Sequence, residues 1–211
     1  MTAQLQAFNS DRIVSETVVK LIKDLEIECI VETGTFSGVT TAFLAESFPT
    51  LQIFTVEVKF ETFLVAEKRL KPFKNVKQIC GSSEKALKTL LPTLTGKRVL
   101  FYLDAHWEDY WPLLDELDEI QRNNANSCCI VIDDFMVPNR PFKYDKYKDQ
   151  PLDLNYVLAK LKMIYKTPYY FFNDKTTRNP VAVGKLYCIP EEWKESLTIP
   201  LTKDAGFLYV K

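Results

Sequence analysis

Acidic residues recur in this chain directly after short apolar stretches, where a carboxylate can bind a cation or a hydroxyl group. They are Glu32, Glu57, Asp104 and the pair Asp133-Asp134. Each apolar stretch predicts a buried strand, and the carboxyl ends of parallel strands meet at one edge of a sheet. Like charges gathered at one edge repel one another unless a cation offsets them. We therefore expect a cationic ligand there, either an organic cation or a divalent metal ion.

A glycine turn follows the first of these stretches. The segment Cys29–Gly38 passes from an apolar strand through Gly34 to the start of a helix. Gly34 permits a tight turn and a close approach to a ligand, and we expect Gly38 to let the helix sit close to the sheet. Glu57, one βα unit later, can accept both hydroxyl hydrogens of a ribose. The spacing Gly-x-x-x-Gly lacks the pattern of a pyrophosphate site, which favours S-adenosylmethionine, a cofactor without phosphate.

The remaining acids suit a metal or the far end of the cofactor. Asp104, Asp133 and Asp134 follow adjacent predicted strands and can converge on one divalent ion, since hard cations take carboxylate oxygens. Helix capping or exposure to solvent is the alternative for all three. His106, the only histidine, lies two residues after Asp104 and can act as a general base, as a metal ligand or as a structural residue. We expect Glu32 to shape the cradle and to face the amino-acid end of the cofactor.

Strands and helices must alternate to position these residues. Buried strands are predicted at 29–31, 53–56, 76–79, 99–103 and 128–132, with helices beginning near residues 11, 37, 60, 83 and 112 between them. Continuous apolar strands separated by helices predict an α/β fold, a doubly wound, Rossmann-like, mostly parallel sheet with helices on both faces. We expect one domain over residues 1–211, with its cofactor-binding core at 10–135.

The C-terminal third has a different character. Residues 136–151 show no clear periodicity and predict a long loop that can cover the site. Residues 152–211 predict a helix at 152–165 and strands near 169–172, 182–189 and 207–210. We expect at least two of these strands to pair antiparallel at an edge of the sheet.

Composition excludes several classes of function. The net charge of −1 gives no general signal for nucleic acid, and no apolar run approaches the length of a membrane span. The five cysteines lack a Cys-x-x-Cys pair and suit buried thiols in a reducing compartment. The N-terminus has no apolar core of a signal peptide. We therefore expect a cytoplasmic protein without nucleic-acid or membrane partners. The sequence does not decide whether the chain forms a homodimer. If it does, we expect the N-terminal helix and the tail strands to make the contact.

Residues 10 to 140 resemble class I S-adenosylmethionine-dependent methyltransferases. The segment Val31–Gly38 resembles the first motif of that family, and Thr55–Glu57 resembles the second, whose acid holds the cofactor ribose. Gly81–Glu84 falls where the family contacts the adenine, with helix capping as the alternative. The resemblance implies a set of cofactor-binding residues: Glu32, Thr33, Gly34, Gly38, Glu57, Gly81, Ser82, Ser83 and Asp104.

Within that class, Leu103–Trp107 and Val131–Phe135 are similar to the metal-dependent O-methyltransferases of the catechol and macrocin types. The resemblance implies that Asp104, Asp133 and Asp134 hold Mg²⁺ or another divalent cation, and that the acceptor is a hydroxyl of a small molecule. His106 stands where the sugar-modifying group has an acid as base. The catechol type uses a lysine in this loop, and this sequence has none between Asp104 and Asp134.

Three other functions are weighed against this one. A metal-independent methyltransferase needs Asp133 and Asp134 only as structural residues. An NAD-dependent oxidoreductase uses a similar sheet, but the glycine pattern of this chain argues against it. The third is a non-catalytic binding module. It would be favoured if the loop at 136–151 filled the space above Asp104 and left no room for an acceptor.

Overall fold

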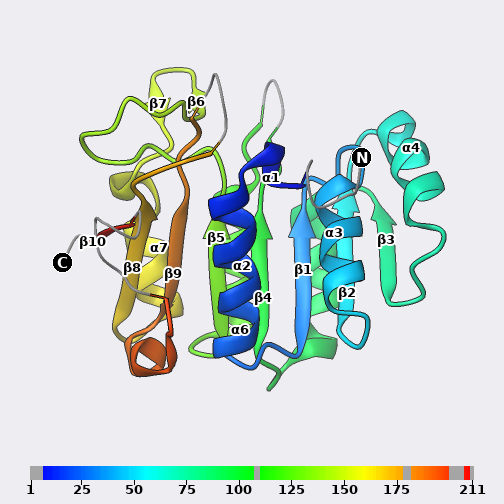
Figure 1. Ribbon diagram of the computed structural model, residues 1–211, viewed down its shortest axis with the longest axis horizontal. Coiled ribbons are helices and arrows are strands. Elements are labelled where there is room, and N and C mark those ends of the chain that lie inside the picture. The colour runs from blue at the N-terminus through cyan, green and yellow to red at the C-terminus, as the bar shows by residue number, and fades with distance from the viewer. Residues whose placement is uncertain (1–6, 107–109, 178–181, 200–206, 210–211) are drawn as a thin grey trace.

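Eight strands form one sheet in the order β10-β8-β9-β5-β4-β1-β2-β3 (Figure 1). The computed structural model describes residues 7–106, 110–177, 182–199 and 207–209. Five parallel strands build the first part of the sheet: β1 (Cys29–Thr33), β2 (Gln52–Glu57), β3 (Val76–Cys80), β4 (Val99–Leu103) and β5 (Cys128–Ile132). The predicted doubly wound α/β fold is confirmed.

The C-terminal strands form the antiparallel edge that the sequence predicted. The strand β9 (Leu186–Pro190) pairs antiparallel with β5, and β8 (Pro168–Asn173) pairs antiparallel with β9. The strand β10 (Phe207–Tyr209) completes this edge beside β8. The predicted strand 182–189 begins later than expected, at Leu186, because residues 183 and 184 contact the segment around Lys143 instead.

Helices cover both faces of the sheet. They are α2 (Arg12–Asp24), α3 (Val39–Ser47), α4 (Phe60–Leu70), α5 (Ser83–Leu90), α6 (Leu113–Asn124) and α7 (Leu154–Ile164), with one further turn, α1 (Ala7–Ser10). Side chains of α2 and α3 pack with Ile30 and Leu100 on one face, and side chains of α5, α6 and α7 pack with Val31 and Phe101 on the other. Because alternate residues of each strand meet different helices, the central strands β4 and β5 are apolar and buried throughout. The strand β3 lies at an edge of the sheet, contains Lys77 and Gln78 and is only partly buried, so the prediction of a buried strand at 76–79 was wrong in that respect.

The segment 136–151 is more ordered than the sequence predicted. It contains a short antiparallel ladder of β6 (Lys146–Tyr147) and β7 (Gln150–Pro151). Backbone hydrogen bonds attach it to the end of β5, where the Asp145 N–H donates to the Asp134 carbonyl at 2.8 Å. A strand is recognised in a sequence by the alternation of apolar and polar residues, and two residues are too few to show it. The β6–β7 ladder was therefore not predictable from the sequence.

Candidate functional site

The cradle begins where β1 ends, at Gly34. Its φ of +83° lies in the left-handed region that favours glycine. A Cβ there would lie 2.4 Å from the carbonyl oxygen of Asp104, so the turn after β1 approaches the end of β4 closely. Gly38 also has a positive φ, but its role differs from the prediction. A Cβ at Gly38 would meet Leu70 of α4 at 3.2 Å, so this glycine lets α3 approach α4 and not the sheet.

Glu57, at the end of β2, is held by two backbone donors. Its Oε2 accepts from the Phe36 N–H and its Oε1 from the Lys59 N–H, both at 2.8 Å. Each carboxylate oxygen has further lone pairs, so the side chain keeps capacity to accept from a ligand. Glu57 lines a cavity of about 410 Å³ together with Gly34, Gly81, Ser83 and Asp104. The structure thus brings the predicted ribose acid and part of the predicted adenine segment to one cavity.

Glu32 lies in an adjoining cavity of about 140 Å³. It is buried and accepts hydrogen bonds from the hydroxyls of Thr41 and Thr55, the latter at 2.7 Å. Burial raises its pKa to about 7, and the two hydroxyls oppose that rise. Because Gly34 and Asp104 line both cavities, the two spaces adjoin at the first glycine turn.

Other predicted cofactor residues take different positions. Thr33 and Ser83 are buried, and their hydroxyls have no hydrogen-bond partner among the described residues. Ser82 is the N-cap residue of α5, yet its side chain makes no capping bond and is likewise unpartnered in the described part of the chain. Capping by side chains, the alternative for this segment, is therefore not what the structure shows.

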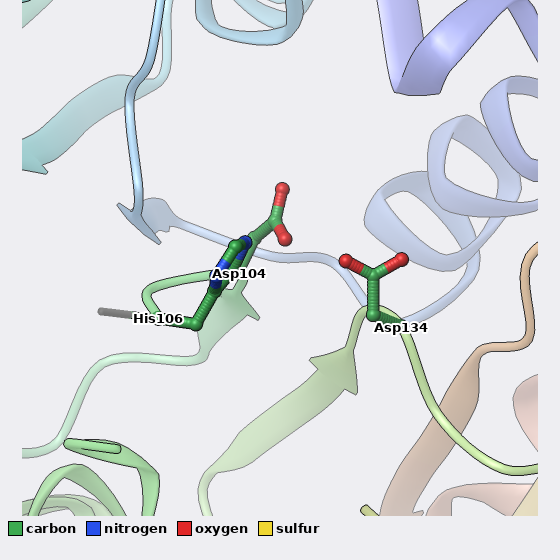
Figure 2. Close-up of side chains that lie close together, drawn as sticks. All are labelled: Asp104, His106 and Asp134. Atoms are coloured by element: carbon green, nitrogen blue, oxygen red, sulfur yellow. The ribbon is translucent and has the colours of Figure 1, made fainter. Parts of the chain in front are cut away.

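Asp104, His106 and Asp134 come together at the ends of β4 and β5. One ligand atom from each lies within 4.8 Å of the others, and Figure 2 shows the two carboxylates side by side with the imidazole next to Asp104. Neither carboxylate has a hydrogen-bond or ion-pair partner among the described residues. Burial, then the neighbouring Asp133 and Asp134 charges, hold the pKa of Asp104 well above its usual range. Burial, then Asp133, raises the pKa of Asp134 to about 6.

Asp133 does not belong to this group, although the sequence placed it there with Asp134. Its carboxylate pairs with the ammonium of Lys185, and the two side chains are 1% and 2% exposed. It also accepts from the Tyr102 hydroxyl and, at 2.6 Å, from the Asp134 N–H. The side chain is therefore buried and engaged below the site, although Asp133 also lines the cavity of about 140 Å³.

Sequence reasoning missed Lys185 and Asp145. Lys185 is the one charge within the apolar run 181–189, a signal that could have indicated a buried partner. Asp145 comes from the segment 136–151, and its Oδ2 lies 3.8 Å from the His106 Nδ1. Of the aromatic residues near these loops, Phe135 and Trp111 are buried, Tyr144 is exposed, and Trp107 lies outside the described residues.

Several solved structures resemble this chain in their fold. The O-methyltransferase TomG from Streptomyces achromogenes, in complex with SAM, matches with a TM-score of 0.59 at 18% identity, covering 84% of this chain and 79% of that one. The O-methyltransferase from Bacillus cereus, in complex with SAH, matches with a TM-score of 0.62 at 12% identity, covering 84% and 81%. The SAH-bound methyltransferase PaMTH1 from Podospora anserina matches with a TM-score of 0.55 at 18% identity, covering 85% and 79%.

The chain has the fold of these methyltransferases. No protein-family model matches the sequence, and no curated protein matches it either. At such low identity the likeness shows the fold alone. In this methyltransferase fold the described cavities lie beyond the carboxyl ends of the parallel strands, where ligands of doubly wound sheets bind. No described helix is both long and apolar enough to cross a membrane.

Proposed function

We propose that this chain transfers the methyl group of S-adenosylmethionine to a hydroxyl of a small-molecule acceptor, assisted by a divalent metal ion. The observation that carries the proposal is the cavity of about 410 Å³, which is lined both by Glu57 and Gly81 and by Asp104, His106 and Asp134. One space thus connects a ribose-binding acid with a group of side chains able to prepare a hydroxyl. The solved methyltransferases of this fold that bind SAM or SAH support the cofactor assignment.

The two cavities divide the cofactor between them. We assign the adenosine to the larger cavity, with its ribose hydroxyls donating to Glu57 and its base near Gly81 and Ser83. We assign the amino-acid end to the smaller cavity, above Glu32 and the start of α3. Since Gly34 and Asp104 line both, the sulfonium at the junction lies close to the Asp104 carboxylate, which offsets its positive charge.

The residues at the end of β4 and β5 fit a divalent metal. Asp104 and Asp134 supply oxygen donors and His106 a nitrogen, and both carboxylates lack other partners in the described part of the chain. A bound metal would lower the pKa of an acceptor hydroxyl and fix its oxygen. The chain's own contribution is orientation, since methyl transfer requires the oxygen in line with the methyl group. His106 is placed either to take the hydroxyl proton or to bind the metal.

Metal-independent methyl transfer is the second candidate. The Lys185 ammonium already offsets one of the clustered acids, which favours it. Under that function Asp104 and His106 would orient and deprotonate the hydroxyl without an ion. We further propose, from the fold and from the composition, a cytoplasmic protein whose acceptor is a small molecule.

Calorimetric titration with S-adenosylhomocysteine tests the cofactor assignment. We expect saturable binding to the full chain, and weak or absent binding to Glu57→Ala. A panel of catechols and hydroxylated sugars, assayed with labelled cofactor with and without a chelator, then tests the acceptor class and the metal. Absence of cofactor binding under all conditions would overturn the proposed function.

A further inference from the structure

The strongest unassigned feature is the ion pair between Lys185 and Asp133 below the paired carboxylates. The proposed function above brings a metal to this place, and the inference rests on that proposal. The Asp133 carboxylate is 1% exposed and paired with a buried ammonium, so a cation at the surface of the site would have to displace that ammonium to bind it. Its second oxygen already accepts from Tyr102. Three donors thus hold this carboxylate: Lys185, Tyr102 and the Asp134 N–H.

The same pair determines where Asp134 points. Asp134 has a φ of +48°, a left-handed conformation that is uncommon outside glycine. Its N–H donates to the Asp133 carboxylate, and its carbonyl accepts from the Asp145 N–H. The turn is therefore fixed from both sides, and the Asp134 carboxylate lies beside that of Asp104. Lys185 acts through Asp133 as a positioning residue for this turn.

His106 has the surroundings of a metal ligand. A histidine that binds a metal through one ring nitrogen usually turns the other towards a carboxylate, which fixes the ring and raises its basicity. Here the Nδ1 faces Asp145 at 3.8 Å, while the ring stands beside Asp104 and Asp134. Asp145 comes from the segment attached to β5, so the orienting carboxylate and the ligand Asp134 share one anchor.

A second observation points to an occupant at this group. Glu116, on α6, is 0% exposed, and neither of its oxygens has a hydrogen-bond partner among the described residues. It lines a recess of about 10 Å³ together with Asp104, His106 and Asp134. That volume is about the size of one water molecule. Burying a carboxyl without a hydrogen-bond partner costs free energy of folding. A hydrogen-bond donor in the recess, such as a water molecule bound to a cation, would remove that cost.

We propose that the chain binds a borderline divalent metal ion such as Co²⁺ or Zn²⁺ through Asp104, Asp134 and the imidazole of His106, with Asp133 withheld from the ligands by Lys185. Imidazole suits first-row transition metals, whereas Mg²⁺ prefers oxygen donors throughout. The ligand set thus differs from the three aspartates that the sequence resemblance implies.

The decisive experiment measures metal binding without turnover. The full chain, stripped with a chelator that is then removed, is titrated with Mg²⁺, Mn²⁺, Co²⁺ and Zn²⁺ by calorimetry, and the visible absorption of bound Co²⁺ is recorded. We expect Co²⁺ affinity to fall at least tenfold in His106→Ala with a changed Co²⁺ spectrum. In His106→Asp, which exchanges nitrogen for oxygen, we expect the ratio of Mg²⁺ to Co²⁺ affinity to rise at least tenfold. Asp149→Asn, fully exposed in the same segment, is the matched control and should change neither.

The role of Asp133 is tested by removing both buried charges together. In the double variant Asp133→Asn/Lys185→Met we expect Co²⁺ affinity to fall by about 10- to 100-fold, the usual effect of removing a support behind the ligands, whereas Asp104→Asn abolishes measurable binding. Loss of metal binding in a folded double variant, or unchanged Co²⁺ affinity and spectrum in His106→Ala, would overturn the inference. His106 is exposed, so its variants test the inference even if the double variant does not fold. Binding of S-adenosylhomocysteine, measured in parallel, reports on the proposed function independently of the metal.

Discussion

Lys185 and Asp133 are 52 residues apart in the sequence, yet their side chains form an ion pair with 2% and 1% exposure. The pair joins the antiparallel strand β9 to the end of the parallel strand β5. Breaking a buried pair by removing one partner leaves an uncompensated charge, whereas removing both can be nearly neutral. This relationship makes the stability of the chain dependent on Lys185, a residue outside the segments on which the sequence resemblance rests.

We expect Lys185→Met to lower the free energy of unfolding by about 3–5 kcal/mol, because Asp133 then stays buried and charged. In the double variant with Asp133→Asn a large part of that loss should be regained. Urea unfolding of the two single variants and the double variant gives the coupling free energy. Lys160→Met is the control, since its pair with Asp118 is partly exposed and should cost no more than about 1 kcal/mol. Equal losses at Lys185 and Lys160 would contradict the buried pair.

Gly34 and Gly96 offer a matched comparison, because their φ angles are +83° and +84°. Alanine at Gly96 meets open space, so Gly96→Ala should cost only the left-handed strain of about 1–2 kcal/mol. Gly34→Ala adds a Cβ 2.4 Å from the Asp104 carbonyl oxygen, and we expect a clearly larger loss of stability. It should also weaken binding of S-adenosylhomocysteine, as measured by calorimetry. Similar losses in the two variants would show that the turn can move away from β4 at no cost.

Glu57→Gln tests the ribose contact with little change in shape. The amide offers one acceptor where the carboxylate offers two, and it loses the charge that strengthens hydrogen bonds. We expect S-adenosylhomocysteine to bind about 10- to 100-fold more weakly, which corresponds to a charged hydrogen bond of about 1.5–3 kcal/mol. Glu61→Gln, exposed in the first turn of α4, is the control. A cofactor analogue without ribose hydroxyls should bind the wild type and Glu57→Gln about equally, and a large difference would contradict the assigned contact.

Glu116 makes stability depend on pH. Burial raises its pKa from 4.5 to about 7, with the hydroxyls of Ser83 and Thr33 opposing the rise although neither has hydrogen-bond geometry with it. A carboxyl with a raised pKa binds its proton more tightly in the folded chain, so its contribution is present below pH 4.5. That contribution is lost as the pH rises through about 7.

The change from 4.5 to about 7 corresponds to about 3 kcal/mol. In Glu116→Gln this part of the decline should vanish, so the variant gains stability relative to the wild type between pH 5 and pH 8. Urea unfolding at pH 5, 6, 7 and 8 measures the difference. Glu119→Gln, on the same helix and paired with Arg122, should follow the wild-type slope. If the free energy of unfolding of Glu116→Gln falls with pH as steeply as that of the wild type, the Glu116 carboxyl is hydrated or paired in solution.

The sequence predicted the sheet and the glycine turn after β1 because their signals are local. Apolar strands such as Cys128–Ile132, and the turn at Gly34, follow from periodicity and from backbone geometry. The Lys185–Asp133 pair was not predictable, since side-chain periodicity does not indicate which distant residues meet. For the same reason the sequence treated Asp133 and Asp134 alike. Adjacent residues often point in opposite directions, and only the packing of β9 shows which one faces inward.

The distance in sequence between the two buried charges also affects the order of assembly during synthesis. A nascent chain that has reached β5 already contains every residue of the proposed cofactor cradle, from Glu32 to Asp104. It does not yet contain the ammonium that neutralises the end of β5. Since N-terminal parts emerge from the ribosome first, we expect the end of β5 to remain hydrated until β9 arrives and inserts Lys185. Completion of the site is therefore a late, C-terminal step of folding, whereas the cradle for the cofactor is an early one.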